Sequence, residues 1–264
     1  MYRRIAQELR QQIKSGHLGP GEQLPTELEL GERYDASRNT VRDAIKWLTV
    51  NGLVETRPGQ GTFVRRRIVP FVTTLSAAPE TGLGGGESDA AFSEVRERGR
   101  EPSASVPVVA VQQATGNVAA RLRIPAGTEV VSRHQERFID ATPWSLQTSY
   151  YPMDLISQGA VGLISAEQIP GGTVAYLRRT LGLTQVGYRD RILVRSPDDN
   201  ESRFFDLPDD GRIPVVTIMR TGYRAGEDGP VPYRVTYTAL PADRNQLVIN
   251  SGEVPGELAA PADD

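Results

Sequence analysis

The chain has no cysteine among its 264 residues and only two histidines, His17 and His134. Without thiols it cannot form a disulfide, an iron–sulfur cluster or a thiolate zinc site, and it has no cysteine nucleophile. Two histidines exclude a multi-histidine metal cage and leave little room for a Ser/His/Asp triad. We therefore expect no metal, no cofactor and no catalytic residues.

Long apolar runs are also missing. No segment approaches the roughly 18 apolar residues that a transmembrane helix requires, and the charged stretch 1–10 lacks the apolar core of a signal peptide. Hydrophobic residues still make up 38% of the chain and charged residues 24%, which rules out uniform disorder. The sequence predicts a soluble, cytoplasmic protein of two small domains or one large one, with no membrane partner.

Charge is unevenly distributed along the chain. Residues 1–67 hold twelve Lys and Arg against eight Asp and Glu, a net charge of +4. The remaining residues hold eighteen against twenty-five, a net charge of −7, which brings the whole chain to −3. A basic amino-terminal part on an acidic body indicates a polyanion-binding module joined to a part that does not touch the polyanion.

The first 67 residues predict three helices followed by a β-hairpin. Apolar spacing indicates a helix over 2–15; Thr26 begins a capping box for a helix to about Tyr34, and Ser37 caps a third helix. Strands over 53–57 and 62–64 flank a glycine-containing turn. Three helices and a hairpin make a winged helix, in which the third helix enters the major groove of DNA.

The residues suited to DNA contact lie on the third helix and in the hairpin. Base edges need forked or short polar donors, and phosphates attract cations. Glycines let the hairpin backbone approach the duplex closely. On these grounds the candidates are Arg38, Asn39, Thr40, Arg42 and Lys46 on the helix, and Arg57, Gly59, Gln60, Gly61 and Thr62 in the hairpin.

The rest of the chain predicts an α+β domain with a mostly antiparallel sheet. Residues 68–90 have the glycine-rich composition of a flexible linker, and residues 252–264 that of a disordered tail. Between them, β-branched and aromatic runs alternate with short helical segments. The expected strands are 106–112, 129–138, 144–151, 188–194, 214–223 and 231–240, and the expected helices are 92–99, 118–122, 173–181 and 200–207.

Three motifs resemble the GntR family of bacterial transcription regulators. They are Leu24-Pro25-Thr26-Glu27, Ser37-Arg38-Asn39-Thr40-Val41-Arg42-Asp43-Ala44 and Gly59-Gln60-Gly61-Thr62-Phe63-Val64. The resemblance covers residues 1–66 and implies a DNA-binding domain over 1–67. It also implies that Ser37, Arg38, Asn39, Thr40, Arg42 and Gly59 occupy DNA-contacting positions. The chain departs from the family pattern near the start of the second helix, where Leu28 or Glu29 stands at a position that is often basic in the family.

Residues 92–250 resemble the UTRA effector domain of the HutC subfamily, most closely its actinobacterial branch. The matching segments include Phe92-Ser93-Glu94, Arg98–Pro102, Leu146–Pro152, Pro170-Gly171-Gly172 and Arg220–Tyr223. The resemblance implies a chorismate-lyase-like domain over 91–251 that binds a small molecule and forms a homodimer. Such a dimer would place two third helices on a pseudo-palindromic operator in double-stranded DNA.

The chain departs from the UTRA domains that bind phosphorylated amino sugars, and these departures disfavour a sugar-phosphate effector. An Arg-x-Arg pair is replaced by Arg133-His134-Gln135, and Ala90-Ala91 stand where hydroxyl residues are found. An acidic or largely apolar ligand, or no effector, fits better. The candidate effector contacts are Arg133, Gln135, Tyr150, Arg195 and Arg234.

Three functions remain open on the sequence. The first is a ligand-responsive regulator, most often a repressor. The second is an effector-independent repressor of the plasmid-transfer or maintenance type, whose second domain only dimerises. The third, least favoured, is a lyase-like enzyme, against which stands the lack of a converging acid, base and nucleophile.

Overall fold

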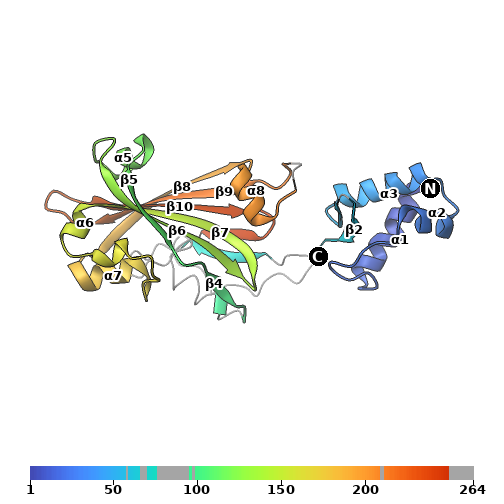
Figure 1. Ribbon diagram of the computed structural model, residues 1–264, viewed down its shortest axis with the longest axis horizontal. Coiled ribbons are helices and arrows are strands. Elements are labelled where there is room, and N and C mark those ends of the chain that lie inside the picture. The colour runs from blue at the N-terminus through green and yellow to red at the C-terminus, as the bar shows by residue number, and fades with distance from the viewer. Residues whose placement is uncertain (58, 66–69, 76–94, 97–98, 209–210, 250–264) are drawn as a thin grey trace. The chain divides into compact units, whose positions relative to one another are not determined.

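The computed structural model describes residues 1–57, 59–65, 70–75, 95–96, 99–208 and 211–249. The chain divides into two compact units, residues 1–69 and 70–264 (Figure 1). In the described part of the chain, no helix is both long enough and apolar enough to span a membrane.

The first unit is the predicted winged helix. Its elements are α1 (Tyr2–Lys14), α2 (Glu27–Tyr34), α3 (Arg38–Val50), β1 (Val54–Arg57) and β2 (Gly61–Val64). Strands β1 and β2 pair antiparallel, and Gln23 adds an isolated bridge to Phe63. One apolar cluster holds the unit together, drawn from all three helices and both strands. Its fully buried members are Ile5, Leu9, Leu30, Val41, Ala44 and Leu48.

The capping signals in the sequence fix where the second and third helices begin. Thr26 and Glu29 form a complete capping box: the Glu29 carboxylate accepts from the Thr26 N–H at 2.8 Å, and the Thr26 hydroxyl accepts from the Glu29 N–H at 3.3 Å. The Ser37 hydroxyl accepts from the Thr40 N–H at 3.3 Å and caps α3. Each cap satisfies a free N–H group of the first turn, an effect worth about 1 kcal/mol.

The second unit is built on one antiparallel sheet, as predicted, in the strand order β4-β6-β7-β10-β9-β8, with β5 also paired to β6. Three short strands were not predicted: β3, β4 and β11. The strands are β3 (Phe71–Leu75), β4 (Pro102–Ala104), β5 (Val108–Gln113), β6 (Glu129–Ile139), β7 (Thr142–Pro152), β8 (Gln185–Arg195), β9 (Val215–Arg224), β10 (Val231–Pro241) and β11 (Asn245–Ile249). The helices are α5 (Gly116–Leu122), α6 (Asp154–Ser157), the 3₁₀ helix η1 (Val161–Ile164), α7 (Gly172–Leu181) and α8 (Asp199–Phe205).

The two faces of the sheet are covered differently. On one face α5 and α8 pack through two apolar clusters, which include Val130, Met219 and Val235 under α5 and Leu146 and Val215 under α8. On the other face, α6, η1 and α7 cover one end of the sheet through a third cluster. The other end is covered by a small cluster in which Leu247 of β11 packs against the sheet. The middle of this second face is therefore left to polar side chains.

Strand β3 lies within the segment predicted to be a flexible linker. It pairs in parallel with β11, in a register that sets Phe71 opposite Asn245. Phe71 is 4% exposed, its ring lies edge-on to Trp144 at a centroid distance of 6.2 Å, and its N–H donates to the Arg244 carbonyl at 3.0 Å. Residues 76–90 of the predicted linker, most of the predicted helix 92–99, and the tail 252–264 lie outside the described residues.

We predict that Phe71→Ala destabilises the second unit by about 3–5 kcal/mol, because it leaves a cavity beside Trp144 and removes the aromatic contact. Urea unfolding followed by tryptophan fluorescence measures this, in a Trp47→Phe background so that Trp144 alone reports. Val72→Ala, on the same strand but only partly buried, is the matched control and should cost less than half as much. An unchanged unfolding midpoint for Phe71→Ala would show that β3 does not anchor the unit.

Candidate nucleic-acid interface and effector site

The exposed side of α3 carries four of the residues predicted to bind DNA. The helix buries Val41, Ala44 and Leu48 against the core of the unit. Because these positions share one side of a 3.6-residue repeat, the opposite side faces outward. That side exposes Arg38, Asn39, Arg42 and Lys46. The fold thus gathers two guanidinium groups, one amide and one ammonium on a single helix surface.

Ser37 and Thr40 occupy the amino-terminal turn of α3. Their hydroxyl oxygens lie 2.9 Å apart, and Ser37 also caps the helix. Both hydroxyls therefore have a local structural role. The free N–H groups and the positive end of the helix dipole at this turn also favour an anion such as a DNA phosphate.

Glu27, the first residue of α2, binds both arginines of the α3 surface. Its Oε2 accepts from Nε of Arg38 at 2.9 Å, and both of its carboxylate oxygens accept from Nε of Arg42 at 3.0 Å. These hydrogen bonds, from Arg38 first and then Arg42, hold the pKa of the Glu27 carboxyl below its usual value. Glu27 was not among the predicted DNA-contacting residues, although it stands in the Leu24–Glu27 motif.

In the hairpin, Arg57 is bound to a carboxylate of its own strand. Its Nε donates to Oε1 of Glu55 at 2.9 Å, and its guanidinium lies 4.7 Å from the centre of the Phe63 ring. Gln60 is exposed, and the Thr62 hydroxyl lies 3.3 Å from that of Thr56.

Both hairpin glycines have positive φ, +72° at Gly59 and +124° at Gly61. A Cβ on Gly61 would collide with Nε2 of Gln23, which donates to the Gln60 carbonyl at 2.9 Å. Gly61 is thus favoured by its positive φ, and a Cβ there would also displace the end of the Gln23 side chain. A Cβ on Gly59 would meet nothing within 4 Å, so its requirement is conformational.

In the second unit, polar side chains cross the middle of the sheet face that lies between the α6–α7 cover and the β11 cover. We call this set the polar face. Strand register aligns Arg133 with Ser149, Ser149 with Thr236, Thr236 with Arg220, and Arg220 with Asp190, and directly paired residues point to the same side of a sheet. The polar face comprises Arg133, Gln135, Arg137, Ser145, Gln147, Ser149, Asp190, Arg220, Arg234, Thr236 and Thr238.

The five predicted effector residues do not lie together. Arg133, Gln135 and Arg234 belong to the polar face, whereas the register places Tyr150 and Arg195 on the opposite face. There Tyr150 packs with the cluster under α5. One pocket on one face of the sheet therefore cannot take all five residues. Gln147, Ser149 and Thr236 also lie on the polar face, and only strand pairing brings them beside Arg133, so no local pattern in the sequence indicates them.

Arg133 is a buried cation held by backbone carbonyls. It is 6% exposed, and its Nη groups donate to the carbonyls of Leu163 at 2.8 Å, Ser165 at 2.6 Å and Glu167 at 2.7 Å. Burial lowers the pKa of its guanidinium. Within the part of the chain that the structure describes, Arg133 has no carboxylate partner, so its positive charge is not neutralised by an ion pair.

The neighbours of Arg133 on the polar face have hydrogen-bond or ion-pair partners for only some of their polar atoms. Arg220 is 2% exposed and forms a two-pronged ion pair with Asp190, at 2.7 and 2.6 Å. Arg234, also 2% exposed, donates to Oε1 of Gln185 at 3.2 Å. Gln147 is 7% exposed, and among the described residues nothing donates to its Oε1. A buried acceptor without a donor costs free energy, so it marks a place where a ligand or a water would bind favourably.

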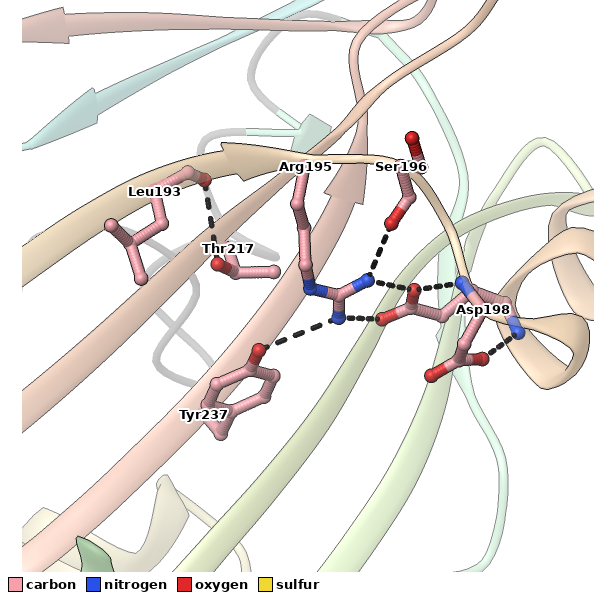
Figure 2. A network of polar contacts seen from close by, with 7 residues as sticks. Leu193, Arg195, Ser196, Asp198, Thr217 and Tyr237 are labelled. Atoms are coloured by element: carbon pink, nitrogen blue, oxygen red, sulfur yellow. Dashed lines mark hydrogen bonds and ion pairs between the residues drawn. The ribbon is translucent and has the colours of Figure 1, made fainter. Parts of the chain in front are cut away.

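Arg195 belongs to a structural network on the opposite face. Figure 2 shows its guanidinium between Tyr237 and the start of α8, beside Ser196 and Asp198. It donates to both carboxylate oxygens of Glu201, at 2.6 and 2.7 Å, and Glu201 also accepts from the Asp198 N–H at 2.9 Å. Arg195 is the last residue of β8 and Glu201 lies in α8, so the pair links the end of that strand to the helix. Glu201 is only 4% exposed, so its carboxylate depends on these partners in place of water.

We predict that Glu201→Gln destabilises the second unit by about 2–3 kcal/mol, because it leaves the Arg195 guanidinium without its counter-ion and weakens the α8 cap. Chemical unfolding measures the loss. Asp199→Asn, an exposed acid in the first turn of the same helix, is the control and should change stability by no more than about 0.5 kcal/mol. Equal midpoints for the two variants would contradict a structural role for Arg195.

Comparison with known protein families agrees with this architecture. Residues 1–64 match the family model described as "Bacterial regulatory proteins, gntR family", and residues 97–244 match the UTRA domain model. The chain is 27% identical over 238 residues to "Probable transcriptional regulator PhnF" of Escherichia coli, covering 90% of each chain. It is 30% identical over 257 residues to an uncharacterised HTH-type transcriptional regulator of Rhizobium meliloti, covering 95% of each.

Solved structures show the same fold. PhnF from Mycobacterium smegmatis superposes with a TM-score of 0.55 at 21% identity, covering 94% of this chain and 99% of that one. The separate effector domain of the same protein gives a TM-score of 0.52 at 18% identity, covering 64% of this chain and 97% of that one.

Proposed function

The chain belongs to the GntR family of bacterial regulatory proteins and carries a UTRA domain, and from this membership we propose that it is a cytoplasmic repressor whose operator binding responds to a small anion. Its relatives are transcriptional regulators. We accordingly assign it no enzymatic reaction.

The observation that carries the DNA-binding proposal is the outer surface of α3. Four of the predicted contact residues, Arg38, Asn39, Arg42 and Lys46, are exposed there together. Guanidinium forks suit guanine edges, an amide suits adenine, and an ammonium suits phosphate. We propose that α3 lies in the major groove, with Ser37 and Thr40 near a phosphate and the hairpin residues Arg57 to Thr62 along the backbone.

We further propose that the protein acts as a homodimer through its second unit. Two copies of α3 would then occupy successive major-groove segments, so that the operator is a pseudo-palindrome. The second copy doubles the number of phosphate contacts, which raises both affinity and salt dependence.

The polar face supports binding of a small anion. Arg133 brings a buried positive charge without an ion-pair partner among the described residues, and Gln147 brings a buried acceptor without a donor. Ser149 and Thr236 add hydroxyls, which lie 3.0 Å apart. An anion bearing a hydroxyl or another donor would compensate the charge of Arg133 and satisfy Gln147.

The β3–β11 pair offers a physical route from effector to DNA-binding unit. Leu247 of β11 packs near Ile218 and Leu240, at the edge of the polar face, and β11 pairs with β3, the first strand after the winged helix. We propose that the effector favours one arrangement of this pair over another. It then alters DNA binding only to the extent that its affinity differs between the two.

Replacing Arg42 by alanine should weaken operator binding by about 1–3 kcal/mol, because it removes one guanidinium from the α3 surface without touching the core. The measurement is titration at fixed salt of the DNA upstream of the protein's own gene, with scrambled duplex as competitor. Arg10→Ala, which removes an exposed arginine of α1, is the matched control. Unchanged selective affinity for Arg42→Ala would exclude α3 as the reading helix.

Arg133→Met should abolish stabilisation of the second unit by small anions, because it removes the charge while keeping most of the side-chain volume. The probes are inorganic phosphate and a panel of small mono- and dicarboxylates, each tested by thermal unfolding. An anion at about 100 times its Kd should stabilise the wild type by roughly 2.7 kcal/mol. Arg189→Met, an exposed arginine on the opposite face, should keep the full response.

If no anion in the panel stabilises the wild type or releases it from DNA, the effector-independent repressor becomes the better description. The second unit would then serve only to dimerise the protein.

A further inference from the structure

We propose that Glu27 is a positioning residue for base recognition, which fixes how Arg38 and Arg42 present their guanidinium groups to DNA. The inference rests on the proposed DNA-binding function of α3 and deepens it, because it concerns what makes that binding selective. A single carboxylate from α2 would set the geometry of two neighbouring readers on α3.

The hydrogen bonds define which edge of each guanidinium is occupied. Both arginines use only Nε toward Glu27, at 2.9 Å for Arg38 and 3.0 Å for Arg42. Their Nη1 and Nη2 groups have no partner among the residues that the structure describes. A guanidinium can grip the O6 and N7 of guanine through Nε and one Nη or through both Nη groups. With Nε occupied, only the end-on fork of two Nη groups remains.

The exposure of the three side chains fits this role. Arg38 and Arg42 are 74% and 55% exposed, so their outer ends are accessible, whereas Glu27 is 32% exposed and lies closer to the protein. Arg38 and Arg42 are four residues apart and share one side of α3. Glu27 itself sits in the first turn of α2, where the helix dipole stabilises a carboxylate.

The same carboxylate penalises non-specific binding. A flexible arginine binds any phosphate oxygen within reach, but an arginine held by Glu27 has less freedom, and the carboxylate repels phosphates that approach its Nε edge. A guanine edge meets the free Nη pair without displacing Glu27. The cluster therefore reduces the loss of side-chain freedom on binding the correct base and disfavours phosphate contacts.

Two variants separate positioning from charge. Glu27→Asp keeps the charge but shortens the side chain by one methylene, so it cannot reach both Nε groups in the same way. Glu27→Gln removes the charge while keeping the length. The matched controls are Glu32→Asp and Glu32→Gln, at an exposed glutamate of the same helix that holds no arginine.

The experiment measures binding of each full-length variant to two duplexes at several salt concentrations. One duplex is obtained by iterative selection of a random pool with the wild-type protein, and the other is its scrambled counterpart. Glu27→Asp and Glu27→Gln should each lower the ratio of the two affinities by about tenfold or more. Glu27→Gln should also bind the scrambled duplex more tightly, with a steeper salt dependence. The Glu32 variants should keep the wild-type ratio.

Base analogues test the geometry directly. Replacing guanines of the selected duplex one at a time by 7-deazaguanine removes the N7 acceptor. At one or two positions the wild type should lose affinity by about tenfold, whereas the Glu27 variants should lose far less, because their arginines no longer hold the end-on fork. A merely structural role would lower affinity equally for every analogue. Circular dichroism shows that each variant is folded.

The outcomes are distinguishable. Wild-type ratios and wild-type analogue losses for both Glu27 variants would overturn the role of Glu27 while leaving the DNA-binding proposal intact. If the selection yields no duplex that the wild type prefers over its scrambled counterpart, the DNA-binding proposal fails, and this inference fails with it.

Discussion

Burying positive charge in the middle of a sheet is the constraint around which the second unit is organised. Arg133, Arg137, Arg220 and Arg234 all lie on the polar face and are at most 6% exposed. A buried guanidinium is tolerable only if hydrogen bonds or a counter-ion replace the water it has lost. Arg220 has Asp190, whereas Arg133 has the carbonyls of the segment after η1. These carbonyls face inward because Arg133 binds them, so the shape of that segment depends on the arginine.

The sequence predicted the first unit almost completely because its signals are local. Capping residues, the apolar repeat of each helix and the glycines of the hairpin all act within a few positions of one another. The hydrogen bonds between Glu27 and the arginines of α3 were not predicted, because they are not local in the sequence. They join two helices across a turn, and the exposed ends of both partners are typical of unremarkable solvated charges. Only their positions in space show that one carboxylate serves two guanidinium groups.

In the second unit, the sequence predicted the long strands but not how they pair. Alternation alone places Arg133 and Gln135 on one face, yet it says nothing about whether Ser149 or Tyr150 lies opposite Arg133. A shift of one residue in register exchanges the two faces, which is why Tyr150 and Arg195 were grouped with residues from which the sheet separates them. Strands β3 and β11 were missed because they are short and pair with partners far away in the chain. A parallel pair of this kind has no turn signal to announce it.

The parallel pair of β3 and β11 also has a consequence for the exchange of modules between regulators. Strand β3 follows the winged helix in the chain, but its hydrogen-bonding partner and its aromatic anchor, Trp144, both belong to the second unit. A chimaera that joined a foreign DNA-binding module downstream of Leu75 would leave β11 with an unpaired edge, prone to pairing with other chains. A chimaera that joined the foreign module upstream of Phe71 would keep β3 paired with β11. In natural recombination and in protein engineering alike, the junction between modules must therefore lie before Phe71.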